Sequence, residues 1–440
     1  MKGVSTKSAH LKLKGTDWIA LILLGFSGQI AWVVENGWFN PFVYENITPD
    51  PRVISWMVGA SAVIATLTTF LMGTLSDKVR KRKPFILVGY ILWGISTALF
   101  PTVAFIKEST IIIAMVVMAD CLMTFFGSTA NDAALNAWIT DITDTTNRGR
   151  VEGVLGALPA LAIMVTFSVS GIVIEKYGYY VFFYALGVIV ILNGLIGGLL
   201  LKDSLSIAKI KTDNSTGFFK RLISTFSVKT IKENKALFIT FIALAVLQIS
   251  VQVYQPYQII YFTDYLHLTK TEMGIVVAII TLITISLIIP FGRMIDRQDR
   301  IKMALIALIV YFAGLLTFSF VRTTPLLLIT GIAMTFGQTG LLAVISAWIR
   351  DLTPIDSRGQ FQGMRMIFFV LVPMIIGPAI GSSLIMSYGI PTIVNGAAGF
   401  IPSPIVFQAG AVICLLTLLP LIATHKLQTK VTIDSQNYGS

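Results

Sequence analysis

Charged residues are scarce in this chain. Only 12% of its 440 residues are Asp, Glu, Lys or Arg, whereas hydrophobic residues make up 55%. A soluble domain typically carries about 25% charged residues and needs polar groups to cover its core. Because apolar runs recur from Trp18 to Thr424, a soluble globular fold is excluded, and a lipid bilayer is the solvent that fits.

Cysteine and histidine are also rare. The two cysteines, Cys121 and Cys414, lie inside apolar runs, and the three histidines lie at or near loops. This distribution excludes a disulfide framework and gives no metal-ligand spacing. The sequence also lacks a phosphate-cradling glycine loop and a nucleophile with a plausible histidine partner. We therefore expect no enzyme activity, no cofactor and no metal site.

Long apolar runs are what the sequence has in abundance. A helix needs roughly 20 apolar residues to cross a bilayer, and a barrel strand needs far fewer. Twelve runs qualify: 18–43, 52–74, 85–106, 110–136, 150–174, 179–201, 235–262, 272–292, 301–321, 325–347, 361–387 and 404–424. The sequence therefore predicts an all-α membrane protein with twelve transmembrane helices.

The net charge of +11 is distributed unevenly between the predicted loops. If the N-terminus is cytoplasmic, 28 of the 33 Lys and Arg residues lie on the cytoplasmic side. The five on the other side are Arg52, Lys107, Lys176, Lys270 and Arg322. This bias predicts a multi-pass protein of the cell membrane with both termini in the cytoplasm. The positive net charge is then explained by membrane topology, so we expect no nucleic acid as a partner.

The two halves of the chain resemble each other. Residues 137–153, AWITDITDTTNRGRVEG, match residues 347–363, AWIRDLTPIDSRGQFQG, at eight of seventeen positions. The repeat predicts two pseudo-symmetric six-helix bundles, 1–201 and 235–440, joined by a cytoplasmic linker, 202–234. That linker is either a tether or an amphipathic helix on the membrane surface. Solute sites in such duplicated proteins lie near the midplane between the halves.

A short motif follows the second run. Gly73, Asp77, Lys78 and Arg82 fit the pattern Gly-x-x-x-Asp-[Arg/Lys]-x-x-x-[Arg/Lys], and a degenerate copy begins at Gly292 with Asp296. With the twelve runs, the linker and the repeat, this motif resembles the signature of the major facilitator superfamily. The resemblance implies a secondary transporter that works by alternating access, with Asp77 in a cytoplasmic gate.

The same loop is loosely similar to that of the sucrose-type and glycoside-pentoside-hexuronide sugar:cation symporters. The similarity lies in SDKVRKRKPFI, residues 76–86. The chain departs from these relatives at Asn136, where they carry an Arg five residues before the cytoplasmic Asp. This difference argues against a sucrose-like solute.

Charged residues near the predicted cytoplasmic ends form the candidate gate. Asp141 with Arg148, and Asp351 with Arg358, recur in both halves and could form ion pairs that close this side. The alternative is that they only cap loops. The full candidate gate is Gly73, Asp77, Arg82, Asp141, Arg148, Asp296, Asp351 and Arg358.

Two carboxylates lie inside predicted spans, where charge is costly. Glu35 and Asp120 are each about nine or ten residues from the outer end of their helix, or ~13–15 Å deep. At equal depth they could share a proton or bind a cation, because burial favours the neutral form of a carboxyl group. The alternatives are a structural pairing, or a position for Glu35 at the membrane interface.

Amides concentrate in the seventh run. Gln248, Gln252 and Gln255 share one helical face, and Pro256 should kink the helix beside them. Amides bind hydroxyl groups without adding charge, and an aromatic ring can stack on a sugar. The candidate solute-binding residues are Gln29, Trp32, Asn36, Gln248, Gln252, Gln255 and Gln338. The alternative is that these amides bond helices to one another.

The residues together favour a monomeric secondary transporter in the lipid bilayer, driven by a gradient rather than ATP. Its partners would be a small-molecule solute and a coupling cation, for which a proton is the first candidate. Symport of a sugar or similar neutral polar solute is the leading hypothesis. The alternatives are a proton-coupled exporter of amphipathic compounds or drugs, and a non-transporting receptor or intramembrane enzyme.

Overall fold

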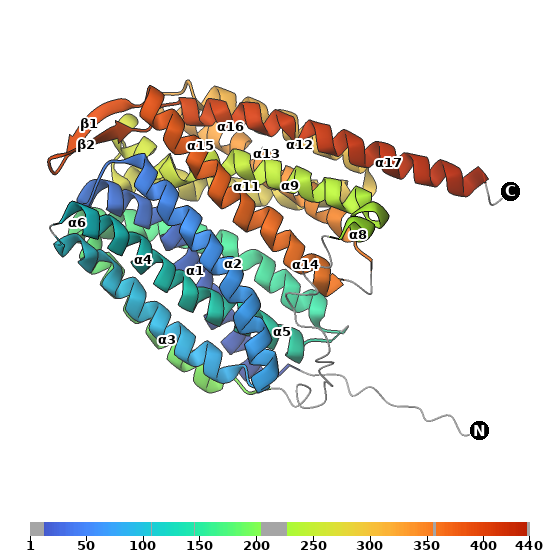
Figure 1. Cartoon of the computed structure of the whole chain (residues 1–440), viewed down its shortest axis with the longest axis horizontal. Coiled ribbons are helices and arrows are strands. Elements are labelled where there is room, and N and C mark those ends of the chain that lie inside the picture. The colour runs from blue at the N-terminus through green and yellow to red at the C-terminus, as the bar shows by residue number, and fades with distance from the viewer. Residues whose placement is uncertain (1–12, 107, 145, 204–226, 355–357, 438–440) are drawn as a thin grey trace.

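The computed structural model describes residues 13–106, 108–144, 146–203, 227–354 and 358–437. These residues fold almost entirely into helices (Figure 1). The first half contains α1 (Gly15–Asn46), α2 (Pro51–Val79), α3 (Lys83–Leu99), η1 (Phe100–Phe105), α4 (Ser109–Gly127), η2 (Ser128–Leu135), α5 (Asn136–Ile142) and α6 (Arg148–Leu200). The second contains α8 (Val228–Glu233), α9 (Lys235–Tyr254), η4 (Gln255–Tyr257), α10 (Gln258–Ile260), η5 (Tyr261–Tyr265), α11 (Lys270–Arg297), α12 (Arg300–Phe318), α13 (Thr324–Leu352), α14 (Arg358–Met366), η7 (Ile367–Leu371), α15 (Val372–Tyr388), β1 (Ile390–Val394), β2 (Ala397–Ile401), α16 (Ile405–Leu416) and α17 (Leu418–Asn437).

The predicted twelve spans are confirmed, with one qualification at α6. Within the described residues, eleven helical stretches are long and apolar enough to cross a membrane, and one of them is the 53-residue stretch Arg148–Leu200. Gly178 interrupts that stretch with a φ of +82°, a conformation that glycine adopts without steric cost. The chain reverses there, so α6 consists of two spans, as the separate runs 150–174 and 179–201 predicted.

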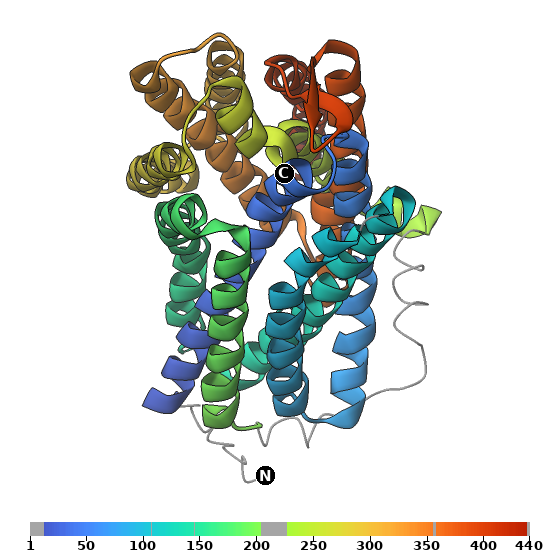
Figure 2. The same cartoon turned by 90° about the vertical axis from the view of Figure 1, so that its left-hand side faces the viewer.

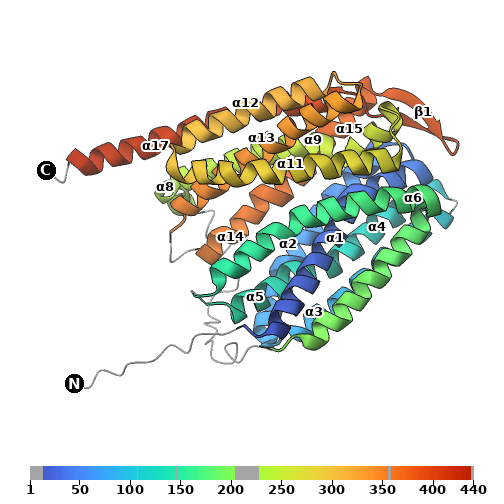
Figure 3. The same cartoon turned by 180° about the vertical axis from the view of Figure 1, so that it is seen from behind.

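The twelve spans form two bundles that lie one above the other in Figure 2. They meet along two seams, α6 against α11 and α2 against α15, and the first is visible in Figure 3. The α6–α11 seam is tight because glycines face it. A Cβ atom on Gly171 would collide with the backbone of Lys270, and one on Gly274 would collide with the Phe167 carbonyl.

Two sides of the molecule need separate names. Helix α1 begins and α17 ends on one side, which we call the terminal side; we call the opposite side the far side (Figure 1). A hairpin of β1 and β2 lies on the far side, where the sequence predicted only a connection between two spans. Its turn, Asn395-Gly396, has both φ angles positive, as a two-residue hairpin loop requires. The hairpin contacts the first half, because Phe400 N donates to Pro49 O at 3.1 Å.

Irregular turns interrupt several of the membrane helices. Pro256 lies in the 3₁₀ turn η4, which confirms the predicted kink. Wider π-helical turns occur at η2, η5 and η7. Such turns are frequent at functional sites, and η2 and η5 both carry aspartates.

The internal repeat is also visible in the packing. Trp138 and Trp348, the tryptophans of the two repeated segments, are both buried. Each indole donates a hydrogen bond near the sixth span of its own half. Trp138 donates to Lys202 O, two residues after the end of α6, at 3.0 Å, and Trp348 donates to Gln428 Oε1 of α17 at 2.5 Å. The repeat therefore preserves how the fourth span of each half is attached to the sixth.

The linker contributes little to the described structure. Most of the predicted linker, residues 204–226, lies outside the described residues, so both alternatives for it stay predictions. The short helix α8 follows them, and Ser227 Oγ caps it by accepting a hydrogen bond from Thr230 N at 3.2 Å.

Candidate functional site

A cavity of about 420 Å³ lies between the two halves, and we call it the central cavity. Its size falls within the range of roughly 300–1,000 Å³ that is typical of small-molecule sites. Spans from both halves form its wall. The lining residues are Gln29, Trp32, Val33, Asn36, Gly37, Pro159, Ile163, Phe167, Val251, Tyr254, Gln255, Gln258, Ile259, Phe262, Val277, Ile280, Thr281, Phe318, Met334, Thr335, Gln338 and Thr339.

Five of the seven predicted solute-binding residues line this cavity. They are Gln29, Trp32, Asn36, Gln255 and Gln338. The Trp32 ring is supported from behind by Trp93, with the ring centroids 5.0 Å apart. The kink at Pro256 ends α9 next to the cavity, which allows both Gln255 and Gln258 to reach its wall.

The placement of Gln248 and Gln252 differs from the prediction, because neither residue lines the central cavity. Gln248 is buried at 8% exposure, and its Oε1 has no hydrogen-bond partner among the described residues. Gln252 packs against α15, where a Cβ atom on Gly377 would collide with it. The shared face was inferred from a straight helix, but packing against α15 takes Gln252 away from the cavity.

Sequence reasoning missed three threonines in the wall, Thr281, Thr335 and Thr339. Two of them could have been found, because on α13 Thr335 lies three residues before Gln338 and four residues before Thr339. A spacing of three or four residues places side chains on one helical face. Hydroxyl groups both donate and accept, so they extend the polar part of the wall without adding charge.

The two predicted carboxylates come together in a buried cluster beside the cavity. Thr124 Oγ1 donates to Glu35 Oε1 at 2.7 Å, and Ser61 Oγ donates to the same oxygen at 3.2 Å. Ser61 also interacts with Asp120, and the two hydroxyl oxygens lie 2.9 Å apart. Glu35 is 6% exposed and Asp120 is 2% exposed. We call these four residues the carboxylate cluster.

The carboxylate cluster is incompletely satisfied. Glu35 Oε2 and Asp120 Oδ1 are buried without a hydrogen-bond partner among the described residues. Neither carboxylate has a Lys or Arg partner within the described part of the chain. A buried pair of charges without compensation is costly, so the cluster suits a proton or a small cation.

A third carboxylate, Asp132, was not predicted as a site residue. It lies in the π-helical turn η2, where it accepts hydrogen bonds from Ser128 Oγ at 3.2 Å and Asn131 Nδ2 at 3.0 Å. It also interacts with the Trp32 side chain, which lines the cavity. Helical spacing gave no signal for it, because a π turn changes which residues of a helix face inward.

On the terminal side, Arg82 is the centre of the charged network of the first half. It binds Asp77 and Ser76, and its Nε donates to Asp141 at 3.1 Å. The predicted partner of Asp141 was Arg148, which instead is exposed at the start of α6. The correction has a geometric cause, because Arg82 lies in the turn between α2 and α3, and α5 ends beside it.

The second half repeats this arrangement. Arg300 Nη2 lies 3.0 Å from Asp351 Oδ2. Arg358 was the predicted partner, and its side chain lies outside the described residues. Asp296 is exposed, and Gly73 has open space where a Cβ atom would lie, so Gly73 is not a point of close helix contact. The described ion pairs of the terminal side therefore lie within each half and do not join the halves.

The far side, in contrast, is where hydrogen bonds between described residues join the halves. Lys270 Nζ lies 2.7 Å from Glu45 Oε2, Tyr179 Oη donates to Glu45 Oε1 at 2.8 Å, and the Lys270 ammonium lies 4.7 Å from the Tyr179 ring centroid. Asn395 of the hairpin donates to Glu45 O at 2.9 Å. We call these four residues the far-side latch.

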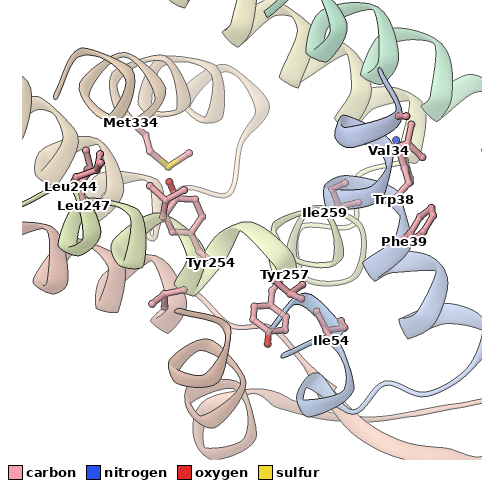
Figure 4. Packing of buried hydrophobic residues seen from close by; sticks show 14 of the residues in the cluster. Val34, Trp38, Phe39, Ile54, Leu244, Leu247, Tyr254, Tyr257, Ile259 and Met334 are labelled. Carbon is pink, nitrogen blue, oxygen red and sulfur yellow. The ribbon is translucent and has the colours of Figure 1, made fainter. Parts of the chain in front are cut away.

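A second contact reinforces the far side. Tyr257 Oη donates to Pro51 O at 3.1 Å, and Figure 4 shows this ring beside Ile54 of α2. The same hydroxyl is also 3.1 Å from Pro378 O of α15. The two bundles are therefore connected on the far side by hydrogen bonds as well as by apolar packing.

Two six-span bundles around a shared cavity, lined by amides and hydroxyl groups as well as apolar side chains, are the architecture of a polytopic membrane transporter. A model of the Major Facilitator Superfamily matches residues 18–258 and 237–435, which together cover most of the chain. The chain belongs to the Major Facilitator Superfamily.

Relatives and solved structures agree with this assignment. An uncharacterized transporter of the same superfamily from Methanocaldococcus jannaschii is 23% identical over 315 residues, which cover 71% of this chain and 76% of that protein. The crystal structure of the nucleoside transporter NupG matches with a TM-score of 0.71 at 14% identity, over 92% of this chain and 98% of that one. A bacterial homologue of the iron transporter ferroportin, in an inward-facing state, matches with a TM-score of 0.64 at 12% identity, over 92% and 97% of the two chains.

Proposed function

We propose that this transporter is a cation-coupled symporter of a sugar, a glycoside or a similar neutral polar solute, with a proton as the coupling cation. The observation that carries the proposal is the chemistry of the central cavity. Among its described lining residues, none carries a charge, whereas five of them are Asn or Gln. Such a wall binds hydroxyl groups and favours a neutral solute over an ion.

The aromatic part of the wall supports a solute with a ring. Trp32 presents an indole that Trp93 holds in place, and Tyr254 adds a second aromatic group. A sugar ring can stack on such a surface while amides bind its hydroxyl groups. The fold likeness to a nucleoside transporter is compatible with a glycoside as solute, although at 14% identity it supports the fold rather than the specificity.

The carboxylate cluster is the proposed coupling site. Glu35 is adjacent in sequence to Asn36, so one helix reaches both the cluster and the cavity. Binding a proton or cation would remove the cost of two unpaired carboxylates and could shift α1 against α2 and α4. The coupling ion and the solute would thus act on the same helix.

We further propose that the terminal side is cytoplasmic, as the distribution of Lys and Arg predicted. The protein would lie in the cell membrane, with units 1–201 and 235–440 rocking about the linker 202–234. A monomer suffices, because one chain supplies the whole cavity. The far-side latch would close the outer side, and rearrangement of the networks at Arg82 and Arg300 would accompany closure of the inner side.

Uptake into proteoliposomes with an imposed pH gradient tests the proposal. A panel of neutral sugars, glycosides including nucleosides, and polyols should contain a solute that accumulates when the gradient is present. Dissipating the gradient with a protonophore should reduce the accumulation to equilibration. The proposal is wrong if no member of the panel moves, or if accumulation is the same with and without the gradient.

Export of amphipathic compounds is the second candidate, and the apolar part of the cavity favours it. Phe167, Phe262, Phe318 and Met334 all line the wall. An exporter would confer resistance to such compounds on cells that express it, and everted vesicles would accumulate them. A symporter would do neither and would increase uptake by whole cells.

A further inference from the structure

A second hollow lies outside the central cavity, in the seam between α2 and α15. Its volume is about 560 Å³. These two helices belong to different halves and lie side by side in Figure 1. The lining residues are Arg52, Ser55, Trp56, Gly59, Ala60, Val63, Ile375, Ala379, Ser382 and Ser383. We call this hollow the seam groove.

The seam groove faces outward from the bundle. Trp56 is 54% exposed, Ile375 is 42% exposed and Val63 is 37% exposed. Small residues, among them Gly59 and Ala60, line the α2 side of the groove. A Cβ atom on Gly59 would lie 3.9 Å from the Ile375 backbone, which is an ordinary van der Waals contact. In a membrane-spanning seam, a groove of this kind is filled by lipid rather than water.

The groove has the depth of one bilayer leaflet. Arg52 lies in the first turn of α2 on the far side, and Val63 lies eleven residues further along the helix. At about 1.5 Å per residue the groove extends ~16 Å into the membrane, close to half of the ~30 Å hydrocarbon thickness. Trp56, one turn below Arg52, has the position of an interfacial anchor.

The charges at the mouth of the groove indicate which lipid fits. Arg52 Nε and Nη2 both point at Asp50, with the closest contact 2.6 Å, and the Arg52 side chain remains 52% exposed. Partial burial alone would raise the pKa of Asp50, but the hydrogen bonds from Arg52 hold it below its ordinary value. The mouth therefore presents a positive and a negative group of zero net charge.

We propose that the seam groove binds a zwitterionic glycerophospholipid. Its phosphate would accept from Arg52 at Nη1, the donor that is not directed at Asp50, and its ammonium group would face the Asp50 carboxylate. One acyl chain would lie along Gly59, Ala60 and Val63, between the two halves. An anionic lipid would match this mouth less well, because Asp50 would repel a second negative charge.

Native mass spectrometry of the full chain with dioleoyl phosphatidylethanolamine as probe tests this proposal. Ala60→Phe fills the space of the acyl chain from α2 and should reduce retained lipid about tenfold. Arg52→Gln should reduce retention to a similar extent. Leu67→Phe, a substitution at an exposed position of the same helix outside the groove, is the matched control and should retain lipid as the native chain does.

Two further arms keep the result decisive. Ser383→Phe fills the groove from α15 and should also reduce the retained lipid about tenfold. It takes the place of Ala60→Phe if the Ala60 variant does not fold. Dioleoyl phosphatidylglycerol should be retained less than the ethanolamine lipid by the native chain. The proposal is overturned if every groove-filling variant that folds retains as much lipid as Leu67→Phe does. It is also overturned if the native chain retains more of the anionic lipid than of the ethanolamine lipid.

Discussion

At the residue scale, the amides of the cavity wall carry the proposed specificity. Gln255 lines the cavity, whereas Gln248, on α9 of the same span, is buried and does not line it. We predict that Gln255→Ala raises KM for the transported solute by about three- to tenfold, the loss of one net hydrogen bond of about 0.5–1.5 kcal/mol.

Gln248→Ala is the matched control for this prediction, because it removes the same side chain outside the cavity. Its KM should stay within about twofold of the native value. Initial rates of radiolabelled solute uptake measure both variants. If both variants raise KM equally, the solute binds the helical face shared by Gln248, Gln252 and Gln255, and the central cavity does not describe the binding site.

Asp132 is the second residue with a testable role. Its carboxylate accepts from Asn131 and interacts with Trp32, so we infer that it positions the indole at the cavity wall. Asp132→Ala should raise KM several-fold more than Asp132→Asn, because Asn retains an acceptor oxygen. Tryptophan fluorescence quenching on solute binding provides a readout that a purely structural defect would leave unchanged. If the Asn and Ala variants behave alike, the positioning role is wrong.

At the element scale, the far-side latch holds α1, α6 and α11 together. The Lys270 and Glu45 side chains are 22% and 28% exposed, so solvent screens the pair and its contribution should be about 0.5–1 kcal/mol. We predict that Lys270→Gln shifts the equilibrium toward the far-side-open state by roughly two- to fivefold.

Spin-label distances across the far side measure this shift. Lys176→Gln is the control, since Lys176 is an exposed far-side lysine whose described contact is with the ring of its neighbour Tyr177. An unchanged distance distribution in Lys270→Gln would mean that apolar packing alone closes this side.

The seam between α6 and α11 depends on glycine. Gly171 lies so close to the Lys270 backbone that a side chain cannot be accommodated without displacing α11. Gly171→Val should therefore prevent far-side closure and abolish solute accumulation. Gly153→Val on the same α6 stretch is the control, because no neighbour of Gly153 lies within 4 Å of the position that a Cβ atom would occupy. Comparable loss in both variants would indicate a general helix defect.

At the scale of the whole molecule, coupling requires the carboxylate cluster and the cavity to act in one cycle. We predict that Glu35→Gln and Asp120→Asn abolish accumulation against a gradient while solute exchange at equal concentrations persists. Replacing the carboxylates removes the proton from the cycle but leaves the cavity wall intact. Counterflow in proteoliposomes measures the exchange, and loss of both activities would place these residues in structural packing instead.

The sequence predicted the coarse architecture well, because a bilayer imposes strict requirements on span length and polarity. Each of the twelve apolar runs corresponds to a span, and the repeated tryptophans correspond to equivalent contacts. The sequence did not predict the local departures from regular transmembrane helices. The hairpin at Ile390–Ile401 and the π turn η2 depend on contacts with distant segments, which hydropathy does not record.

The candidate site was predicted only in part, because contacts between distant segments also decide which side chains form it. Equal depth along α1 and α4 was enough to pair Glu35 with Asp120, but Ser61 and Thr124, which complete the cluster, could not be singled out among many hydroxyl residues. Helical spacing grouped Gln252 with Gln255, but only Gln255 lines the cavity, because the turn at Pro256 and the packing of α15 change the face that reaches it.

By itself, the sequence determined that this chain spans a membrane twelve times in two related halves, because length, hydropathy and repetition are properties of the chain alone. Only the tertiary structure decided which side joins the halves and which arginine binds Asp141 and which binds Asp351. Those outcomes depend on side chains far apart in sequence, such as Glu45 with Lys270 and Arg82 with Asp141, whose approach the folded packing alone determines.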